Sequence, residues 1–178
     1  MDTGAGSYRR YLNGDDTGLA EIVRDHKYGL TLYLCGIVGD AFTAEELMED
    51  VFFKLVTKRP RFSGKSSFKT FLYAIGRNAA LDRLRKDSRL AELSEQTLDE
   101  RHAVERAYIE KERRCELYDA MDGLKPEYRE ALYLTYFEGL SNSEAGTVMH
   151  KSRRQMENLV YRAKKALGEK LGEEFYEE

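Results

Sequence analysis

The sequence predicts an all-α protein with two small helical domains joined by a charged linker, the second domain containing a helix-turn-helix. Apolar residues recur with helical spacing along most of the chain. Only two of the 178 residues are proline, a composition that suits a soluble helical protein. Two helix-capping signals lie close together in the last third. We expect a first domain over residues 1–87, a linker over 88–112 and a second domain over 113–178 that ends in an acidic tail.

Three helices are predicted in the first domain. One amphipathic helix covers Thr17 to Val38. A second is indicated by apolar residues at helical spacing, namely Leu47, Val51, Leu55 and Val56. It should end near Lys58, because Pro60 disfavours a helical residue before it. Ser67 is suited to cap the third helix, which carries one apolar stripe formed by Phe68, Phe71, Leu72, Ile75 and Ala79.

Residues 88–112 are highly charged and have no sustained apolar stripe, which is typical of a connector between domains. A helical pattern returns after Pro126, a residue suited to the first turn of a helix. Gly139 follows where a C-terminal glycine is expected.

The helix-turn-helix is indicated by two capping boxes. Ser141 is followed three residues later by Glu144, and Ser152 by Gln155. The spacing leaves room for one short helix and a tight turn around 149–151. The second helix has apolar residues for packing on one side and starts with polar and cationic ones, which is what reading a DNA major groove requires.

The charge distribution is compatible with a polyanionic partner although the net charge is −3. Positive charge concentrates over 58–89 and again over 151–170. A polyanion is attracted by the local electrostatic potential of such a surface, whatever the net charge of the whole chain. Cys35 and Cys115 lack CxxC partners, so we expect no zinc site and interpret both as small helix residues. We also expect no cofactor, no secretory signal and no membrane insertion, and therefore a cytoplasmic protein.

Four segments occur in an order that resembles extracytoplasmic-function sigma factors of the sigma-70 family. They are AEELMEDVFFKLV, SFKTFLYAIGRNAALDRLRK, LKPEYREALYLTYFEGLSNSEAG and YRAKKAL. The resemblance spans roughly Tyr8 to Leu171. It implies that the N-terminal domain binds core RNA polymerase and opens the minus-ten element of promoter DNA, and that the C-terminal domain binds the minus-thirty-five element. Family members are often held inactive by an anti-sigma factor, so the resemblance implies that partner too.

The resemblance implies a polymerase-binding helix that docks on the clamp of the largest polymerase subunit. The candidates combine an acidic rim with apolar anchors, which suits a basic helical partner: Glu45, Glu46, Leu47, Glu49, Asp50, Val51 and Phe52. An ordinary solvated acidic face is the alternative reading of the same pattern.

The minus-ten candidates combine cations with a loop aromatic that could hold an unstacked base: Arg61, Phe62, Lys65, Lys69, Arg77, Asn78, Asp82 and Arg85. The last four match the family motif that borders the strand-opening surface. Helical spacing assigns Phe68, Phe71 and Leu72 to the core instead.

The minus-thirty-five candidates lie in the predicted recognition helix and the turn before it: Lys151, Arg153, Arg154, Gln155, Glu157, Asn158, Tyr161 and Arg162. Four residues depart from the family pattern here, and one of them is Ala145, which replaces a larger apolar residue. His150 replaces the usual turn glycine, Gly146 reduces bulk and helix propensity, and Glu157 stands where a lysine is common.

Other classes of function explain the chain less well. An enzyme is disfavoured because the three histidines are scattered and no phosphate-binding glycine loop or metal-ligand spacing occurs. A helix-turn-helix transcription regulator without the sigma role would leave the N-terminal motifs unexplained. A helical interaction protein that has lost DNA binding is a third possibility, suggested by His150 and Glu157.

Overall fold

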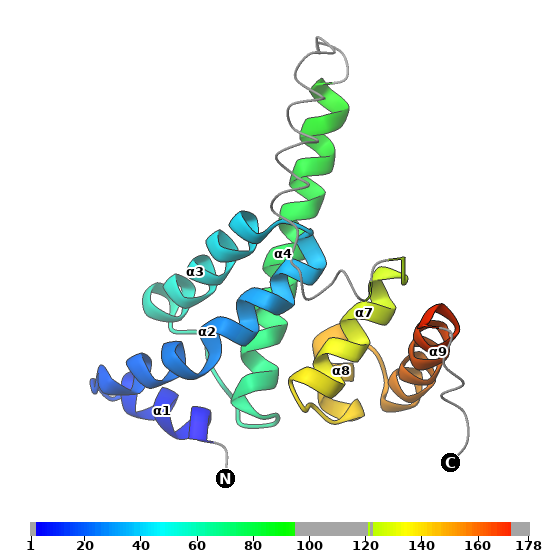
Figure 1. The fold of residues 1–178 in the computed structure, drawn as a ribbon. Helices are drawn as coiled ribbons and strands as arrows, with labels where there is room; N and C mark the ends of the chain where they lie inside the picture. The colour runs from blue at the N-terminus through cyan, green and yellow to red at the C-terminus, as the bar shows by residue number, and fades with distance from the viewer. Residues whose placement is uncertain (1–2, 95–120, 122, 172–178) are drawn as a thin grey trace.

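The computed structural model describes residues 3–94, 121 and 123–171, and it is helical with no strand in these ranges (Figure 1). The all-α prediction is therefore confirmed. The elements are α1 (Thr3–Leu12), α2 (Thr17–Val38), α3 (Ala41–Lys58), α4 (Phe68–Ser94), α7 (Pro126–Leu132), the π-helix η1 (Tyr133–Phe137), α8 (Asn142–Met149) and α9 (Arg153–Leu171). The remainder of the predicted linker and the acidic tail after 171 lie outside the described residues.

In the N-terminal half, α2 packs against α1, α3 and α4. The bounds of α2 match the predicted range, and Gly39 ends the helix with a left-handed φ of 77°. Asp40 begins α3 by accepting a hydrogen bond from Thr43 N at 2.7 Å. Arg59 ends α3 at φ 43°, directly before Pro60 as predicted. The core contains side chains with no exposed surface, including Leu30, Leu34, Leu55, Phe68 and Leu72.

One N-terminal helix was not expected. Helix α1 has few apolar residues, yet Tyr8 is buried and its hydroxyl donates to the Pro60 carbonyl at 2.8 Å. Helix α4 begins where Ser67 Oγ accepts from Thr70 N, and it continues to Ser94, into the predicted linker. In Figure 1 its second half extends beyond the other helices.

The helix-turn-helix is present in the C-terminal half, where α8 packs against α9 and α9 against α7. Both predicted capping boxes are confirmed. At α8 the Ser141 and Glu144 side chains each accept from the other's backbone N–H. At α9 Ser152 N donates to Gln155 Oε1 at 2.7 Å and Gln155 N to Ser152 Oγ at 3.2 Å.

The turn accommodates His150 and Gly146, two of the residues that depart from the family pattern. His150 adopts φ 55° and donates its backbone N–H to Gly146 O, so it serves as a left-handed cap without glycine. A Cβ on Gly146 would lie 2.5 Å from Lys151 O and 3.2 Å from Met156 Cγ. Glycine is therefore required at 146 by the close approach of the turn and α9.

The two halves pack on each other, with α8 against α4 and α7 against α2. Gly139 has φ 67° and follows η1, which continues α7 by one widened turn. Cys35 is a buried residue of α2, as expected of a small helix residue, but it is also disulfide-bonded, which the absence of a CxxC partner did not indicate. Cys115 lies outside the described residues.

Candidate functional site

Helix α3 presents an acidic and aromatic face to solvent. Glu45, Glu49 and Asp50 are exposed and Glu46 is half-buried. The three apolar candidates turn the other way: Leu47, Val51 and Phe52 belong to the core, with at most 7% exposure. The exposed apolar groups are instead Phe42 at 54% and Phe53 at 66%.

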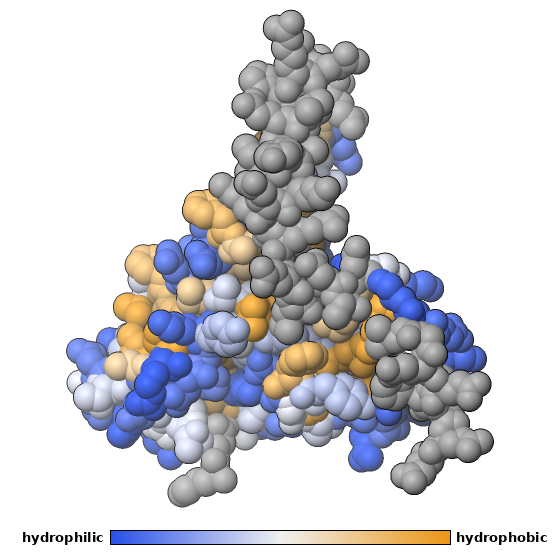
Figure 2. Space-filling model, viewed as in Figure 1, coloured by the Kyte–Doolittle hydropathy of each residue, from blue (hydrophilic) through white to orange (hydrophobic). Residues whose placement is uncertain are grey.

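The exposed groups of α3 form one stripe. Residues 42, 45, 49 and 53 are separated by three or four positions, which is one side of a helix. Figure 2 shows hydrophobic and hydrophilic residues interspersed over α3. Sequence reasoning missed Phe42 and Phe53, although their spacing to Glu45 and Glu49 was a usable signal. We name Phe42, Glu45, Glu49 and Phe53 the α3 face.

The minus-ten candidates divide into exposed and covered groups. Arg61, Lys65, Asn78, Asp82 and Arg85 are exposed. Arg85 Nη1 pairs with Asp82 Oδ1 at 2.9 Å, and such a pair between well-exposed side chains contributes little to stability. Phe62 is half-buried, with its ring centroid 5.7 Å from Phe68 and 5.2 Å from Phe71. Phe68 and Leu72 are fully buried, as predicted.

Lys69 and Arg77 are covered by carboxylates of the C-terminal half. Lys69 Nζ lies 2.8 Å from Glu138 Oε2 and donates to the Glu138 carbonyl at 3.0 Å. Arg77 Nε donates to Glu130 Oε1 at 2.6 Å and its Nη2 to Oε2 at 3.4 Å. Burial lowers the pKa of Arg77, but the hydrogen bond and charge of Glu130 outweigh it and the pKa is raised. Asn78 Oδ1 lies 3.4 Å from His150 Nε2.

The recognition helix α9 exposes a polar and cationic face near its start. Arg154, Asn158, Tyr161 and Arg162 are exposed, and Tyr161 reaches 63%. Their spacing of three or four residues brings them to one side of the helix. The buried residues Met156 and Ala163 belong to the apolar side of α9, which packs in the core.

Other candidates around α9 are engaged within the domain. Arg153 Nε pairs with Glu157 Oε1 at 2.8 Å, so Glu157 neutralises a neighbouring cation. Lys151 Nζ lies 3.3 Å from Glu127 Oε1. Gln155 Oε1 accepts from Ser152 N in the capping box, which fixes that amide at the helix start.

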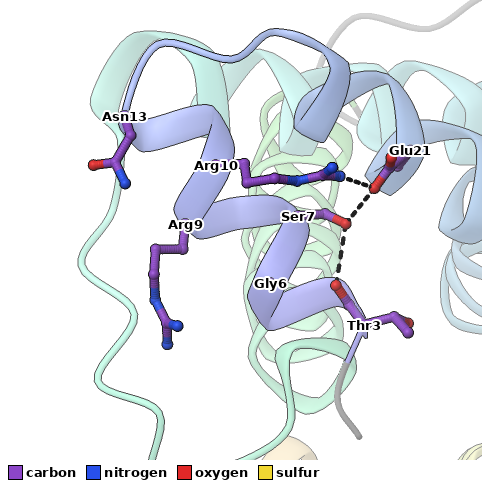
Figure 3. Close-up of a pocket in the computed structure, with 7 residues that line it drawn as sticks. All are labelled: Thr3, Gly6, Ser7, Arg9, Arg10, Asn13 and Glu21. Carbon is purple, nitrogen blue, oxygen red and sulfur yellow. Dashed lines mark hydrogen bonds and ion pairs between the residues drawn. The ribbon is translucent and has the colours of Figure 1, made fainter.

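A depression beside α1 is lined by Thr3, Gly6, Ser7, Arg9, Arg10, Asn13 and Glu21 (Figure 3). Arg10 pairs with Glu21, and Ser7 Oγ lies 2.6 Å from the same carboxylate. These bonds lower the pKa of Glu21, the Ser7 hydrogen bond most. The cluster joins α1 to α2, and we interpret it as structural. The described residues contain no group of three potential metal ligands and no helix long and apolar enough to cross a membrane.

Family models match both halves of the chain. Residues 22–90 match Sigma-70 region 2, and residues 116–167 match Sigma-70, region 4. The ECF RNA polymerase sigma factor SigC of Mycobacterium tuberculosis is 31% identical over 136 residues, which are 73% of this chain and 71% of that protein. The RNA polymerase sigma-H factor of Pseudomonas aeruginosa is 27% identical, and the aligned residues are 91% of this chain and 90% of that protein.

Two solved structures have a similar fold. The sigma factor RpoE, in complex with the anti-sigma factor NepR from Bartonella quintana, aligns with a TM-score of 0.68 at 20% identity, covering 86% of this chain and 96% of RpoE. CnrH, in complex with the cytosolic domain of CnrY, aligns with a TM-score of 0.65 at 21% identity, covering 96% and 95% of the two chains.

Proposed function

Because the chain belongs to the extracytoplasmic-function group of the sigma-70 family, whose members bind core RNA polymerase and direct promoter-specific transcription initiation, we propose that three of its surfaces divide this work. The α3 face docks on polymerase, the cations around α4 hold the opened minus-ten element, and α9 reads the minus-thirty-five element. The match of residues 22–90 to region 2 favours the sigma role over a helix-turn-helix regulator without it.

The α3 face suits the clamp of the largest polymerase subunit. Two exposed aromatic rings, Phe42 and Phe53, supply apolar area, and Glu45 and Glu49 lie between them. Aromatic residues are enriched at protein interfaces, and an acidic rim is complementary to a basic helical partner. Leu47, Val51 and Phe52 act indirectly, because their burial in the core fixes the orientation of α3.

The cations of α4 and of the loop before it suit a separated strand. Arg61 and Lys65 in the loop, with Arg85 on the helix, are exposed and would neutralise backbone phosphates. Lys69 and Arg77 could join them only after leaving Glu138 and Glu130. Asn78 and Asp82 bring hydrogen-bonding groups to the same helix. Extruding a base costs a few kcal/mol, so these contacts must replace the lost stacking and pairing. Phe62 would have to leave its contacts with the core to stack on a base.

The exposed face of α9 suits a duplex major groove. Arg can form two hydrogen bonds to guanine and Asn two to adenine, each pair contributing about 1 to 3 kcal/mol of discrimination. Arg154 and Asn158 are exposed near the helix start and can reach base edges. Glu157 is paired with Arg153, which reduces its repulsion of phosphate.

The observation that carries this proposal is that one chain combines the acidic and aromatic α3 face with the cationic start of α9. The first fits a protein partner and the second fits DNA, as an initiation factor requires. Sigma factors are generally not enzymes, and we infer that this chain has no catalytic residue and acts in the cytoplasm. We also infer an anti-sigma partner, since a similar solved structure is a sigma factor bound to one.

Reconstituted transcription tests the proposal. Transcription starts mapped after overexpression supply a promoter, which is then transcribed by core polymerase with and without the purified chain. We expect specific initiation only when the chain is present. Initiation that is equal without it would refute the proposed function, and initiation that survives Arg154→Ala and Asn158→Ala together would refute the role of α9.

A further inference from the structure

Helix α1 is fixed to the N-terminal domain although it lies outside the residues that match the family. The match to Sigma-70 region 2 begins at residue 22. The helix has no acidic residue and carries Arg9 and Arg10 in its last turn. Ser7 Oγ lies 2.6 Å from Glu21 Oε2, and a Cβ on Gly18 would lie 2.2 Å from Ser7 O, so the backbones of α1 and α2 touch. This short cationic helix is therefore held in one place on the domain.

The two arginines of α1 point in different directions. Successive residues of a helix are about 100° apart, so Arg9 lies roughly opposite Ser7, on the side of α1 away from α2. Figure 3 shows the Arg9 side chain directed away from Glu21, with which Arg10 pairs. Of these two arginines, only Arg10 forms an ion pair with a residue in the described ranges. Arg9 is exposed and is available to a ligand.

The loop after α3 lies along α1. The Tyr8 hydroxyl donates to the Pro60 carbonyl at 2.8 Å, and the guanidinium carbon of Arg59 lies 5.5 Å from the centroid of the Tyr11 ring. Both tyrosines are buried, so this contact is a fixed part of the fold. In Figure 3 the loop passes the side of α1 that carries Arg9. Arg9 and Arg59 therefore border one surface although they are far apart in the sequence.

Arg59 has a backbone conformation that glycine adopts without strain. It ends α3 at φ 43°, in the left-handed region. Glycine is the usual residue at such a helix end, because a Cβ is unfavourable there. Strained residues persist where the surrounding structure holds them, and they cluster at functional sites. The Arg59 side chain is exposed with its cation over the Tyr11 ring, so this position presents a charge where the backbone alone favours glycine.

We propose that Arg9 and Arg59 form a phosphate-binding site that extends the surface for the opened strand onto α1. The ligand is the sugar-phosphate backbone of separated DNA, next to the phosphates that Arg61 and Lys65 neutralise. A guanidinium binds a phosphate through two parallel hydrogen bonds. Such contacts position a strand without reading its bases, so the contribution of the site does not depend on the promoter sequence. The inference rests on the proposed function, because it assumes that the chain holds an opened strand.

Strand binding by the complex of the full-length chain with core polymerase tests the site. The probe is a fluorescent single-stranded oligonucleotide that covers the minus-ten element of a mapped promoter and the bases on either side. Anisotropy measures its affinity over a range of salt concentrations. We expect R9A/R59G to bind the probe about tenfold more weakly. Each lost phosphate contact should reduce the steepness of log K against log salt concentration by about 0.7, so two lost contacts should reduce it by about 1.4.

Two controls separate phosphate binding from general effects. K27A/K165A is the matched variant, because it removes two exposed cations, on α2 and α9, that lie outside this surface. It should bind the probe with unchanged affinity and salt dependence. Arg59→Gly alone separates binding from stability, since glycine relieves the left-handed strain. Its thermal unfolding should occur at the same or a higher temperature, while its affinity for the probe falls.

Three results would overturn the inference. One is an affinity of R9A/R59G within twofold of the unmodified chain, with the same salt dependence. Another is an equal loss of affinity in K27A/K165A, which would be a general charge effect. The third is a loss in Arg59→Gly that occurs only together with reduced thermal stability, since the arginine would then act through the fold.

R61A/K65A, measured in parallel, separates this inference from the proposed function. If R61A/K65A weakens strand binding and R9A/R59G does not, the site on α1 fails and the proposed role of the loop stands. If R9A/R59G weakens binding and R61A/K65A does not, the site on α1 stands and the role of the loop cations fails. If the chain does not bind core polymerase, the proposed function fails, and the same comparison made with the chain alone decides the inference.

Discussion

Removing the Phe53 ring should weaken the association with core polymerase. The residue is 66% exposed on the α3 face. A phenylalanine side chain can bury about 200 Å², so docking could cover about 130 Å² of the exposed part of this one. At about 25 cal/mol per Å² this corresponds to about 3 kcal/mol. Since part of such energy is offset by the costs of association, we expect Phe53→Ala to raise the Kd for polymerase by about 10- to 100-fold.

Fluorescence-detected titration of labelled chain with core polymerase measures this change. Tyr28→Ala is the matched control, because it removes an aromatic ring that is 75% exposed on α2 instead of α3. Circular dichroism should be unchanged in both variants, since neither ring belongs to the core. A Kd for Phe53→Ala within twofold of the unmodified chain would refute the assignment of the α3 face, as would an equal loss with Tyr28→Ala.

Three further predictions address the DNA surfaces and the helix-turn-helix. Arg85→Glu should abolish promoter opening and spare polymerase binding, because Arg85 is exposed on α4 outside the α3 face; an unchanged yield of open complex in permanganate footprinting would contradict this. Asn158→Ala should weaken holoenzyme binding to a mapped duplex promoter by about 1 to 3 kcal/mol, as measured by filter binding. An equal loss of affinity on a promoter with a scrambled minus-thirty-five element would show that Asn158 does not read a base. The pKa of the Glu144 carboxyl is lowered, mainly by the hydrogen bond that it accepts from the Ser141 backbone N–H. The carboxylate therefore stabilises the cap fully above its ordinary pKa of 4.5. This contribution is lost as pH falls through the lowered pKa. Glu144→Gln should keep the capping box at neutral pH, because Gln155 makes the same backbone bond at α9, and it should flatten the acid dependence of denaturant unfolding; parallel acid profiles would disprove it.

Local signals in the sequence were sufficient for the helices with clear ends. Helix α2 has the predicted bounds, and both capping boxes form, because a serine and the residue three positions later satisfy each other's backbone within one turn. Helix α1 has no such signal. Its burial depends on Tyr8 reaching the carbonyl of Pro60, a contact between distant positions that periodicity does not encode.

The orientation of α3 could not be predicted because apolar residues occur on most of its sides. Leu47, Val51 and Phe52 look like interface anchors until α2 and α4 cover them. Phe42 and Phe53 then remain exposed. Tertiary packing, and not local spacing, decides which apolar residues of an amphipathic helix reach a partner.

The contact between the two halves had only a faint signal. Glu130 and Arg77 are 53 positions apart in sequence, and nothing in either segment names the other as a partner. Gly29 was the one local irregularity at the contact, and an isolated glycine within a helix indicates a close approach without saying what approaches. The covered state of Lys69 and Arg77 therefore emerged only from the fold.

Association of the purified chain with core RNA polymerase tests the account most directly. Size-exclusion chromatography of the mixture at about 0.15 M salt, where exposed charges are already screened beyond about 8 Å, should give co-elution in equal amounts, and Phe53→Ala should reduce it. Separate elution of a folded chain and active polymerase would contradict the central claim.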